Sequence, residues 1–531
     1  MLRSTQSQES IRASLKPVGA IAISVTSLLV LTGCSAFLEG FREVLAEEAS
    51  PSQEATASPS PSQNLGDLDG FYAQGVTWVP CWGEFECTEI AAPLDWDNPE
   101  SGEIKLSMIR SKVDQPLGSL LVNPGGPGGS GVDYVINAFT FLGTSELRNE
   151  YSIVGFDPRG VGESTAVVCG DRKLKDELLY AQSPHEYGSA DDLARSENLI
   201  TQFAENCATG SGEILPYIDT VSAARDLDLM RHLLGDEQLN YLGFSYGTKL
   251  GATYAALYPD RVGRMVLDGA IDPRVSEEEQ LIAQAAGFEL AFTNYVMDCL
   301  SRSDCPLNGS VNQALAQVSQ FLGQLETETL RTDLGRPLTL SGGFTGIIAA
   351  LYSTANWQFL TQGLTEAFGG DGTTLLFLAD FYNDRSQSGS YESNLIEANI
   401  AINCADGRFS RDTQVVAETN AALLEAAPLF GRYFQNPQVS CSGWGEPRPQ
   451  AALDYSVALA NPILVLGTTG DPATPYQQAV ALADLMSGAT LITYEGDGHT
   501  VYAGISVCVD ELVDSYFLAG EVPAADAVCS S

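Results

Sequence analysis

Short apolar runs recur along the chain, and most of them end at turn-forming residues. Their length and their alternation of apolar and polar positions are typical of β-strands. They lie at 104–109, 119–122, 151–156, 239–242, 262–267, 462–466 and 489–494. Between two of these runs, residues 220–234 place apolar side chains at helical spacing. This alternation predicts an α/β fold with a mainly parallel sheet and helices on both faces.

The stretch 275–449 interrupts this rhythm. It is rich in helical patterns and opens with Ser276 followed by three glutamates, which is typical of a helix start. Strand patterns return only near residue 462. We therefore expect a large helical cap at 275–449, inserted into a core made of residues 71–274 and 450–531.

The N-terminus predicts export. Three basic residues precede an apolar run at 18–31, which is too short for a confident membrane span and typical of a secretory signal. The run ends in Leu-Thr-Gly-Cys, which resembles a bacterial lipobox. We expect residues 1–33 to be removed and Cys34 to be lipidated, which anchors the protein on the extracellular face of the membrane. An ordinary signal peptide with an incidental cysteine is the alternative.

Within residues 34–70, the composition from about 46 to 67 turns to Ser, Pro, Ala, Gln and Glu, which cannot bury enough apolar surface to fold. This segment is expected to be a disordered tether. The whole chain carries 68 acidic and 27 basic residues, a formal charge of −41. Such a charge repels a phosphate backbone, so nucleic acid is not an expected partner. It could attract cations such as a peptide ammonium, but strong solvation of a secreted protein is the preferred explanation of the charge.

Cysteines support the same compartment. The chain has 11, and assigning Cys34 to lipid leaves an even number, as expected for disulfides outside the cytoplasm. A zinc site is disfavoured because there is no Cys-x-x-Cys and the chain has 3 histidines. Spacing alone cannot determine connectivity. The economical pairing is Cys81 with Cys87, Cys169 with Cys207, Cys299 with Cys305, Cys404 with Cys441, and Cys508 with Cys529.

A Gly-x-Ser-x-Gly pattern places Ser245 directly after the predicted strand 239–242 and before a helix of small residues. In a chain with 51 glycines the pattern alone is a weak signal. Its strand–turn–helix context, however, is that of a nucleophile elbow, in which a strained turn exposes the serine Oγ. The elbow predicts the α/β-hydrolase fold with Ser245 as the nucleophile.

A serine nucleophile needs a base. Of His185, His232 and His499, the last follows the final predicted strand, where the order Ser, Asp or Glu, His of an α/β-hydrolase puts the base. Asp471 follows the preceding strand and is the expected partner of His499. Asp497 competes for that role but lies too close in sequence to reach the ring, and Thr474 is a candidate for holding the Asp471 loop.

An oxyanion hole needs two N–H groups. We expect one from Tyr246, the residue after the nucleophile. The second is expected from the glycine-rich run 125–129, where the lack of side chains lets backbone approach a substrate. Gly126 is the first choice and Gly125 the second. No metal and no cofactor are expected in this mechanism.

Three segments together resemble the secreted tripeptidyl aminopeptidases of actinobacteria, relatives of the prolyl iminopeptidases. They are Gly-Gly-Pro-Gly at 125–128, Gly-Phe-Asp-Pro-Arg-Gly-Val-Gly-Glu-Ser at 155–164 and Gly-Phe-Ser-Tyr-Gly-Thr at 243–248, supported by 402–406 and by the segments of Asp471 and His499. Prolyl iminopeptidases have His where this chain has Pro124, which favours the tripeptidyl branch. The resemblance implies an acyl-enzyme that releases short peptides from free N-termini.

An exopeptidase that recognises a free amine needs a carboxylate in its cleft. Asp406 is the first candidate and Glu163 the second, although Asp406 has an alternative role in stabilising the loop around Cys404. Asp157 and Arg159 are expected to brace the loop after their strand. Besides a peptidase with peptide substrates, two alternatives remain open: an esterase or lipase with the same triad, and a substrate-binding lipoprotein on an inactive scaffold.

Overall fold

The computed structural model describes residues 67–525 and 527–530, and its framework is a ten-stranded sheet in the order β1-β2-β3-β5-β4-β6-β7-β8-β9-β10. The first four strands in that order pair antiparallel, and from β5 onward all pairs are parallel. The strands are β1 (Val79–Cys81), β2 (Phe85–Pro93), β3 (Glu103–Ser111), β4 (Ser119–Asn123), β5 (Ser152–Phe156), β6 (Leu239–Phe244), β7 (Val262–Asp268), β8 (Ile463–Gly470), β9 (Ala489–Asp497) and β10 (Ala527–Ser530).

Every strand expected from the sequence is present, whereas β1, β2 and β10 were not predicted. Strand β2 carries exposed Glu89 among its buried residues, because it lies near the sheet edge and one of its faces is partly open to solvent. Strand β10 is only four residues long and pairs with β9. Such short or half-polar runs lack the continuous apolar pattern that marks the central strands.

Helices cover both faces of the sheet, as the apolar pattern predicted. Successive residues of β4 point to opposite faces: Leu121 joins one buried cluster, and Leu120 and Val122 join the other. The first cluster includes α2 (Leu68–Ala73), α7 (Thr220–Leu234), α8 (Tyr246–Leu257) and α16 (Tyr476–Leu485). The second includes α3 (Gly131–Ala138), α4 (Ser145–Glu150) and α17 (Val507–Ala519).

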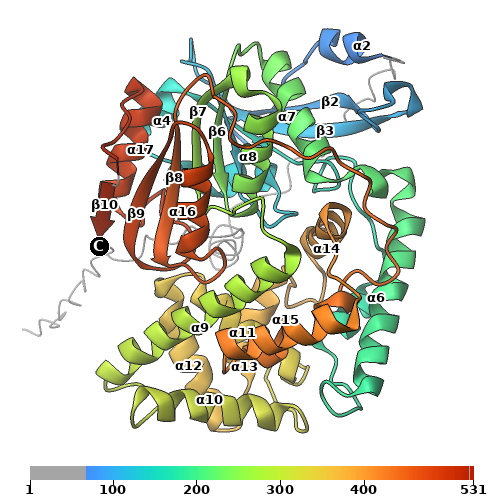
Figure 1. Ribbon diagram of the computed structural model, residues 1–531, viewed down its shortest axis with the longest axis vertical. Helices are drawn as coiled ribbons and strands as arrows, with labels where there is room; N and C mark the ends of the chain where they lie inside the picture. The colour runs from blue at the N-terminus through green and yellow to red at the C-terminus, as the bar shows by residue number, and fades with distance from the viewer. Residues whose placement is uncertain (1–66, 526, 531) are drawn as a thin grey trace, which may run out of the picture. The chain divides into compact units, whose positions relative to one another are not determined.

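A second group of helices packs around an apolar cluster of its own and lies below strands β6–β9 in Figure 1. It comprises α9 (Glu277–Ser301), α10 (Val311–Leu325), α11 (Leu340–Leu351), α12 (Trp357–Phe368), α13 (Thr373–Tyr382) and α15 (Thr413–Ala426). The start of α9 is a capping box between Ser276 and Glu279. We call these helices the cap.

Packing divides core and cap differently from the sequence boundaries. Helix α5 (Arg172–Tyr180), which precedes the long helix α6 (Ala190–Gly210), lies within the stretch expected to be core, yet Tyr180 is buried in the cap cluster. Conversely, α14 (Leu395–Asp406) lies within the expected cap, but Ala398 and Ile402 pack into the core cluster. A buried ion pair of 2.5 Å between Lys175 and Glu397 joins α5 to α14.

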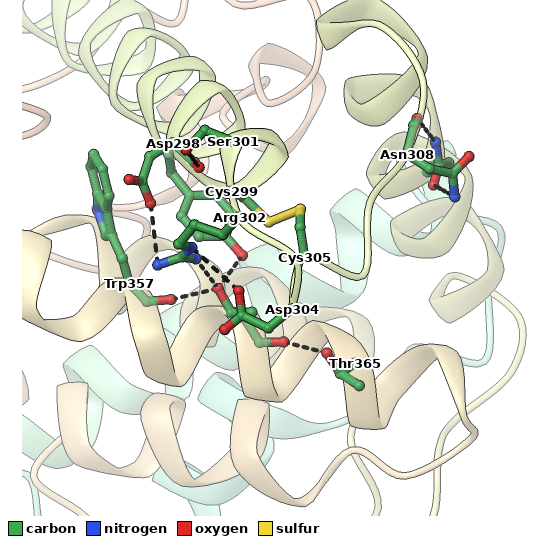
Figure 2. Close-up of a disulfide and its surroundings, with 12 residues drawn as sticks. Asp298, Cys299, Ser301, Arg302, Asp304, Cys305, Asn308, Trp357 and Thr365 are labelled. Atoms are coloured by element: carbon green, nitrogen blue, oxygen red, sulfur yellow. Dashed lines mark hydrogen bonds and ion pairs between the residues drawn. A yellow bond between two sulfur atoms is a disulfide. The ribbon is translucent and has the colours of Figure 1, made fainter.

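Five disulfides link the ten cysteines of the described residues, in the pairing expected from the sequence. Figure 2 shows the one between Cys299 and Cys305, which closes the turn at the end of α9. Inside this turn Arg302 donates to Thr361 Oγ1 of α12 at 2.7 Å. It also forms an ion pair of 3.2 Å with Asp298 (Figure 2). The turn therefore attaches the end of α9 to α12.

The predicted signal peptide (1–33), Cys34 and the tether up to residue 66 lie outside the described residues. The predicted tether extended to residue 70, but α2 begins at Leu68, where Asp67 caps the helix by accepting from Gly70 N. Within the part of the chain that the structure describes, no helix is both long and apolar enough to span a membrane.

Candidate active site

Ser245 lies in the turn between β6 and α8, with φ 55° and ψ −122°. A positive φ is unfavourable for a residue with a side chain, and this strained turn is characteristic of a nucleophile elbow. The turn is held by the backbone N–H of Ser245, which donates to Asp268 O at the end of β7 at 2.8 Å. Ser245 is partly exposed although its neighbours Phe244 and Tyr246 are buried, so its Oγ is presented to a substrate.

The two glycines of the elbow are required by close backbone approach. A Cβ on Gly243 would lie 2.4 Å from Gly247 O, and a Cβ on Gly247 would lie 2.8 Å from Asn123 Oδ1. Either contact would push helix α8 away from the strands. This explains why the serine is flanked by glycine on both sides, and it positions the elbow directly beside the end of β4.

Asp471 follows β8 and His499 follows β9, and the two side chains form a buried pair. The His499 Nδ1 atom lies 2.9 Å from each oxygen of Asp471. Asp471 also accepts from the Ala473 and Thr474 N–H groups at 2.9 Å and from Thr474 Oγ1 at 3.1 Å. These contacts fix the carboxylate and orient the ring, which leaves Nε2 as the nitrogen available to act as a base.

The electrostatic environment of His499 favours its charged form. The residue is 3% exposed, and burial lowers the pKa of His499. The charge and hydrogen bond of Asp471, together with the charge of Asp268, more than offset burial and raise the pKa above its ordinary value. An imidazolium formed during proton transfer is therefore stabilised in place.

The nucleophile and the base flank the same two residues, Asp268 and Gly269. Ser245 N donates to Asp268 O, and a Cβ on Gly269 would lie 3.2 Å from His499 Cε1. Strands β6 to β9 are parallel, so the loops that carry Ser245, Asp471 and His499 emerge at one edge of the sheet. The structure thus brings the three residues of the expected triad to one place.

The glycine-rich run after β4 lies against the elbow. A Cβ on Gly125 would be 2.9 Å from Ser245 Cβ and 3.2 Å from Tyr246 N. The N–H of Gly125 already donates to Asn123 Oδ1 at 3.0 Å, whereas that of Gly126 is bonded to no acceptor among residues 67–525 and 527–530. Tyr246 is the first residue of α8, where N–H groups have no acceptor within the helix. The geometry therefore favours the N–H groups of Gly126 and Tyr246 over that of Gly125.

The cap contacts the acid and base loops directly. Tyr352, at the end of α11, accepts from His499 N at 2.9 Å, and its ring meets the His499 ring at 90° with centroids 5.4 Å apart. On α9, Gln284 donates to Ala473 O at 3.2 Å, and a Cβ on Gly287 would lie 2.6 Å from Pro472 O. None of these cap residues was identified from the sequence, where an aromatic residue at a helix end carries no functional signal.

Asp406, the first candidate for binding a substrate amine, is already paired. It accepts from Lys249 Nζ at 2.9 Å, from Thr220 N at 2.7 Å and from Thr220 Oγ1 at 2.5 Å. These bonds join α14 to α7 and α8, so the structural alternative is favoured, although its partners are these helices and not the loop around Cys404. A cavity of about 380 Å³ borders the Lys249–Asp406 pair, and none of the triad residues lines it.

Glu163, the second candidate, is exposed in the loop after β5. Its N–H donates to Asp157 Oδ2 at 2.8 Å, and the other oxygen of Asp157 accepts from Ser130 Oγ at 2.6 Å. Asp157 therefore braces its loop as expected, and it does so against the start of α3. Arg159 is a brace as well, but it pairs with Asp226 of α7 at 2.6 Å and not with Asp157.

The other polar candidates are directed elsewhere. Asp497 accepts from Asn294 Nδ2 of α9 at 2.5 Å, which leaves Asp471 as the partner of His499. His185 and His232 are exposed. In the part of the chain described by the structure, no group of three or more His, Cys, Asp or Glu side chains is arranged to hold a metal ion.

Comparison with known proteins gives consistent results. The sequence model of the alpha/beta hydrolase fold matches residues 118–503. The serine protease Hip1 of Mycobacterium tuberculosis is 36% identical over 479 residues, which cover 86% of this chain and 91% of that protein. Carboxylesterase B of the same species is 38% identical over 451 residues, or 84% and 86% of the two chains. The tripeptidyl aminopeptidase of Streptomyces lividans is 28% identical over 474 residues, or 86% and 87%.

The family model spans most of the chain, including the loops that carry Ser245, Asp471 and His499. Two relatives exceed one-third identity over most of both chains. The fold expected from the elbow and from the alternation of strands and helices is thereby confirmed. This chain is a serine hydrolase and belongs to the alpha/beta hydrolase family, and its relatives include Hip1, carboxylesterase B and the tripeptidyl aminopeptidases.

Proposed function

We propose that the chain is a cell-surface serine exopeptidase that releases short peptides, chiefly tripeptides, from free N-termini through an acyl-enzyme on Ser245. One observation carries the chemistry: the Ser245 elbow, the Asp471–His499 pair and the Gly125–Gly126 turn meet at one edge of the sheet. The choice of peptides as substrates is supported by the names of two relatives, a serine protease and a tripeptidyl aminopeptidase.

In the first half-reaction, Ser245 Oγ attacks the scissile carbonyl carbon while His499 Nε2 takes the hydroxyl proton. The charge that develops on the carbonyl oxygen is stabilised by the N–H groups of Gly126 and Tyr246. The C–N bond then breaks, and His499 returns the proton to the leaving amine. The short N-terminal peptide stays bound to the enzyme as an ester of Ser245.

In the second half-reaction, water attacks the ester carbonyl and gives a proton to His499. The bond to Ser245 Oγ breaks, the serine recovers its proton, and the short peptide leaves with a new carboxyl group. Asp471 takes no part in bond making and stabilises the imidazolium form of His499 in each half-reaction. No external oxidant, metal or cofactor is needed to balance these steps.

Recognition of the substrate amine is assigned to Glu163 in this proposal. Asp406 would have to give up its 2.9 Å ion pair with Lys249 to bind an ammonium. Glu163 is exposed and follows β5, whose carboxyl end lies at the same edge as the elbow. The adjacent Gly162 N donates to Asn394 Oδ1, which begins α14. A carboxylate at this junction is accessible to the first residue of a bound peptide.

The proposal is tested with a chromogenic tripeptide anilide that has a free amine and with its N-acetylated form. We expect the free-amine substrate to have the higher kcat/KM by about 10- to 100-fold, the value of a hydrogen bond to a charged group. Glu163→Gln should reduce this ratio toward one. Equal turnover of both substrates by the wild-type enzyme would exclude amine recognition. Ser245→Ala is the control, because it should abolish both activity and fluorophosphonate labelling.

An esterase is the second candidate function, because carboxylesterase B is 38% identical over most of its length. A short-chain p-nitrophenyl ester tested beside the two anilides decides between them. A peptidase of this type is expected to hydrolyse activated esters as well, so rate alone is not diagnostic. Efficient ester turnover combined with no detectable cleavage of unblocked peptides would favour the esterase.

Location at the cell surface is part of the proposal and depends on Cys34. We expect the wild-type protein in the membrane fraction of an exporting host and Cys34→Ser in the medium or in the soluble fraction. Accessibility of the wild-type protein to added protease on intact cells shows which face it occupies. A wild-type protein that fractionates as soluble would contradict the lipid anchor.

A further inference from the structure

A second buried carboxylate, Asp268, ends strand β7 beside the triad. It is fully buried, and its Oδ2 accepts from Val501 N at 2.9 Å and from Tyr502 N at 2.8 Å. Its Oδ1 has no hydrogen-bond partner among the described residues. A buried carboxylate oxygen without a partner is costly, so an apolar or amide residue would be less costly here if packing alone were required.

Asp268 is one of three carboxylates that hold the loop after His499. Five consecutive N–H groups, at residues 500–504, donate to them in turn: Thr500 to Asp471, Val501 and Tyr502 to Asp268, and Ala503 and Gly504 to Asp510. In this loop Thr500 and Ala503 have φ of 66° and 75°, values unfavourable for residues with side chains. The loop therefore keeps its shape through these carboxylates and not through its intrinsic preference.

The same residue also contacts the nucleophile, because Asp268 O accepts from Ser245 N at 2.8 Å. One residue thus fixes the elbow with its backbone and the His499 loop with its side chain. We propose that Asp268 is a positioning residue for the reaction, which sets the His499 loop against the Ser245 elbow and supplies a second negative charge to the imidazolium. Asp471 orients the ring itself, and Asp268 acts through the loop and through its charge.

Few charged groups act on Asp268 and on His499. The groups that interact electrostatically with Asp268 are His499, which lowers its pKa, and Asp471, which raises it. Burial is the largest influence and raises the pKa of Asp268, whereas the hydrogen bonds from the N–H groups of Tyr502 and Val501 lower it. Together these influences raise the pKa of Asp268 to about 7. His499 faces Asp471, Asp268 and, from the cap, the ring of Tyr352. The charge on Asp268 therefore changes within the pH range in which a histidine base operates.

The inference rests on the proposed roles of Ser245 and His499 but not on the choice of peptide substrates. Its test therefore uses the rate of fluorophosphonate labelling, which reports activation of the serine whatever the enzyme cleaves. If labelling persists in Ser245→Ala or His499→Ala, the proposed triad is wrong. Labelling that disappears in both variants leaves the triad intact, and the inference about Asp268 is then judged by its own variant.

The variant is Asp268→Asn in the full-length protein, with the labelling rate constant measured from pH 5 to 9. Asparagine keeps a carbonyl oxygen for Val501 and Tyr502, removes the charge, and places its NH2 group at the position of Oδ1, which has no partner among the described residues. We expect the acidic limb of the profile to move down by about one pH unit, because a neighbouring negative charge raises a histidine pKa by that amount or more. The plateau should fall about threefold, because a weaker base accepts the serine proton less readily.

Asp510→Asn is the matched control. Asp510 holds Ala503 N and Gly504 N of the same loop at 2.9 and 3.0 Å, but it is not among the charges that act on His499. It should leave the acidic limb in place even if the protein becomes less stable. An unmoved limb in Asp268→Asn, or an equal shift in both variants, would overturn the inference.

Hydrogen exchange of the wild-type protein provides a test that needs no variant. If Asp268 holds the loop, the amides of Val501 and Tyr502 should exchange slowly at pH 8, as slowly as we expect for the strand amides of β7. Their protection, corrected for the intrinsic rate, should fall as the pH is lowered through 7, because a protonated carboxyl is a weaker acceptor. Rapid exchange of both amides throughout this range would contradict the role of Asp268.

Discussion

The loop that carries Ser245 and the loop that carries His499 lie beside each other, but different kinds of contact hold them. The elbow is built mainly from neighbours in sequence: Gly243 and Gly247 let the turn close, and Thr248 donates to Ser245 O at 2.6 Å. The backbone of Asp268 adds one bond to Ser245 N. The His499 loop depends on distant residues, namely Tyr352 in the cap and Asp268, which lies 233 positions from Val501.

The difference separates two requirements of the mechanism. The nucleophile must be presented at a fixed point in front of the oxyanion donors, and a strained local turn meets that need with one non-local backbone bond, from Ser245 N to Asp268 O. The base must change its charge in every cycle, so it needs partners that stabilise the imidazolium and hold the ring in one orientation. Because those partners come from the core and from the cap, the cap has a direct influence on the base and little on the elbow.

Replacement of Asp471 tests the contacts that hold His499, and it is expected to have the largest effect on activity. In Asp471→Asn the amide would present an N–H group to His499 Nδ1 and favour the wrong tautomer, so kcat is expected to fall by about 10⁴-fold. Asp497→Asn is the control, because Asp497 bonds to Asn294 and not to the ring. Steady-state kinetics with the anilide measures both. A loss of similar size in Asp497→Asn would show that the acid has been assigned to the wrong residue.

The same contrast explains what could be predicted from the sequence. Ser245, Asp471 and His499 each follow an apolar strand, so their order predicts a triad, and the structure places the three residues at one edge of the sheet. The ion pair that engages Asp406 spans 157 positions to Lys249, and no local pattern indicates it. Tyr352 and Asp268 were missed for the same reason, because their contacts join residues far apart in sequence: Tyr352 reaches His499 only after the cap has packed on the core, and the Asp268 side chain reaches Val501 and Tyr502 only after the core has folded.

Gly125→Ala tests the nucleophile side. A Cβ there would lie 2.4 Å from Phe244 O and 2.9 Å from Ser245 Cβ, and the residue has φ +92°. We expect kcat/KM to fall on the order of 100-fold, because the displaced turn would move the N–H group of Gly126 and misplace one oxyanion donor. Gly188→Ala is the control for the backbone alone, because Gly188 has φ +74° and no atom within 4 Å of an added Cβ. A comparable loss of activity in that variant would attribute the effect to general instability.

Tyr352→Ala is expected to have the smallest effect, because it removes the aromatic contact with His499 but keeps the carbonyl oxygen that accepts from His499 N. An edge-to-face contact between rings is worth about 0.5–1.5 kcal/mol, which corresponds to a two- to tenfold fall in kcat/KM. Tyr352→Phe, which keeps the ring and loses the 3.1 Å contact with the Tyr382 hydroxyl, should stay close to wild type. Thermal melting of each variant separates loss of stability from loss of activity in the folded enzyme. If the alanine variant has a lower melting temperature but an unchanged kcat/KM, the cap supports the fold and does not influence the base.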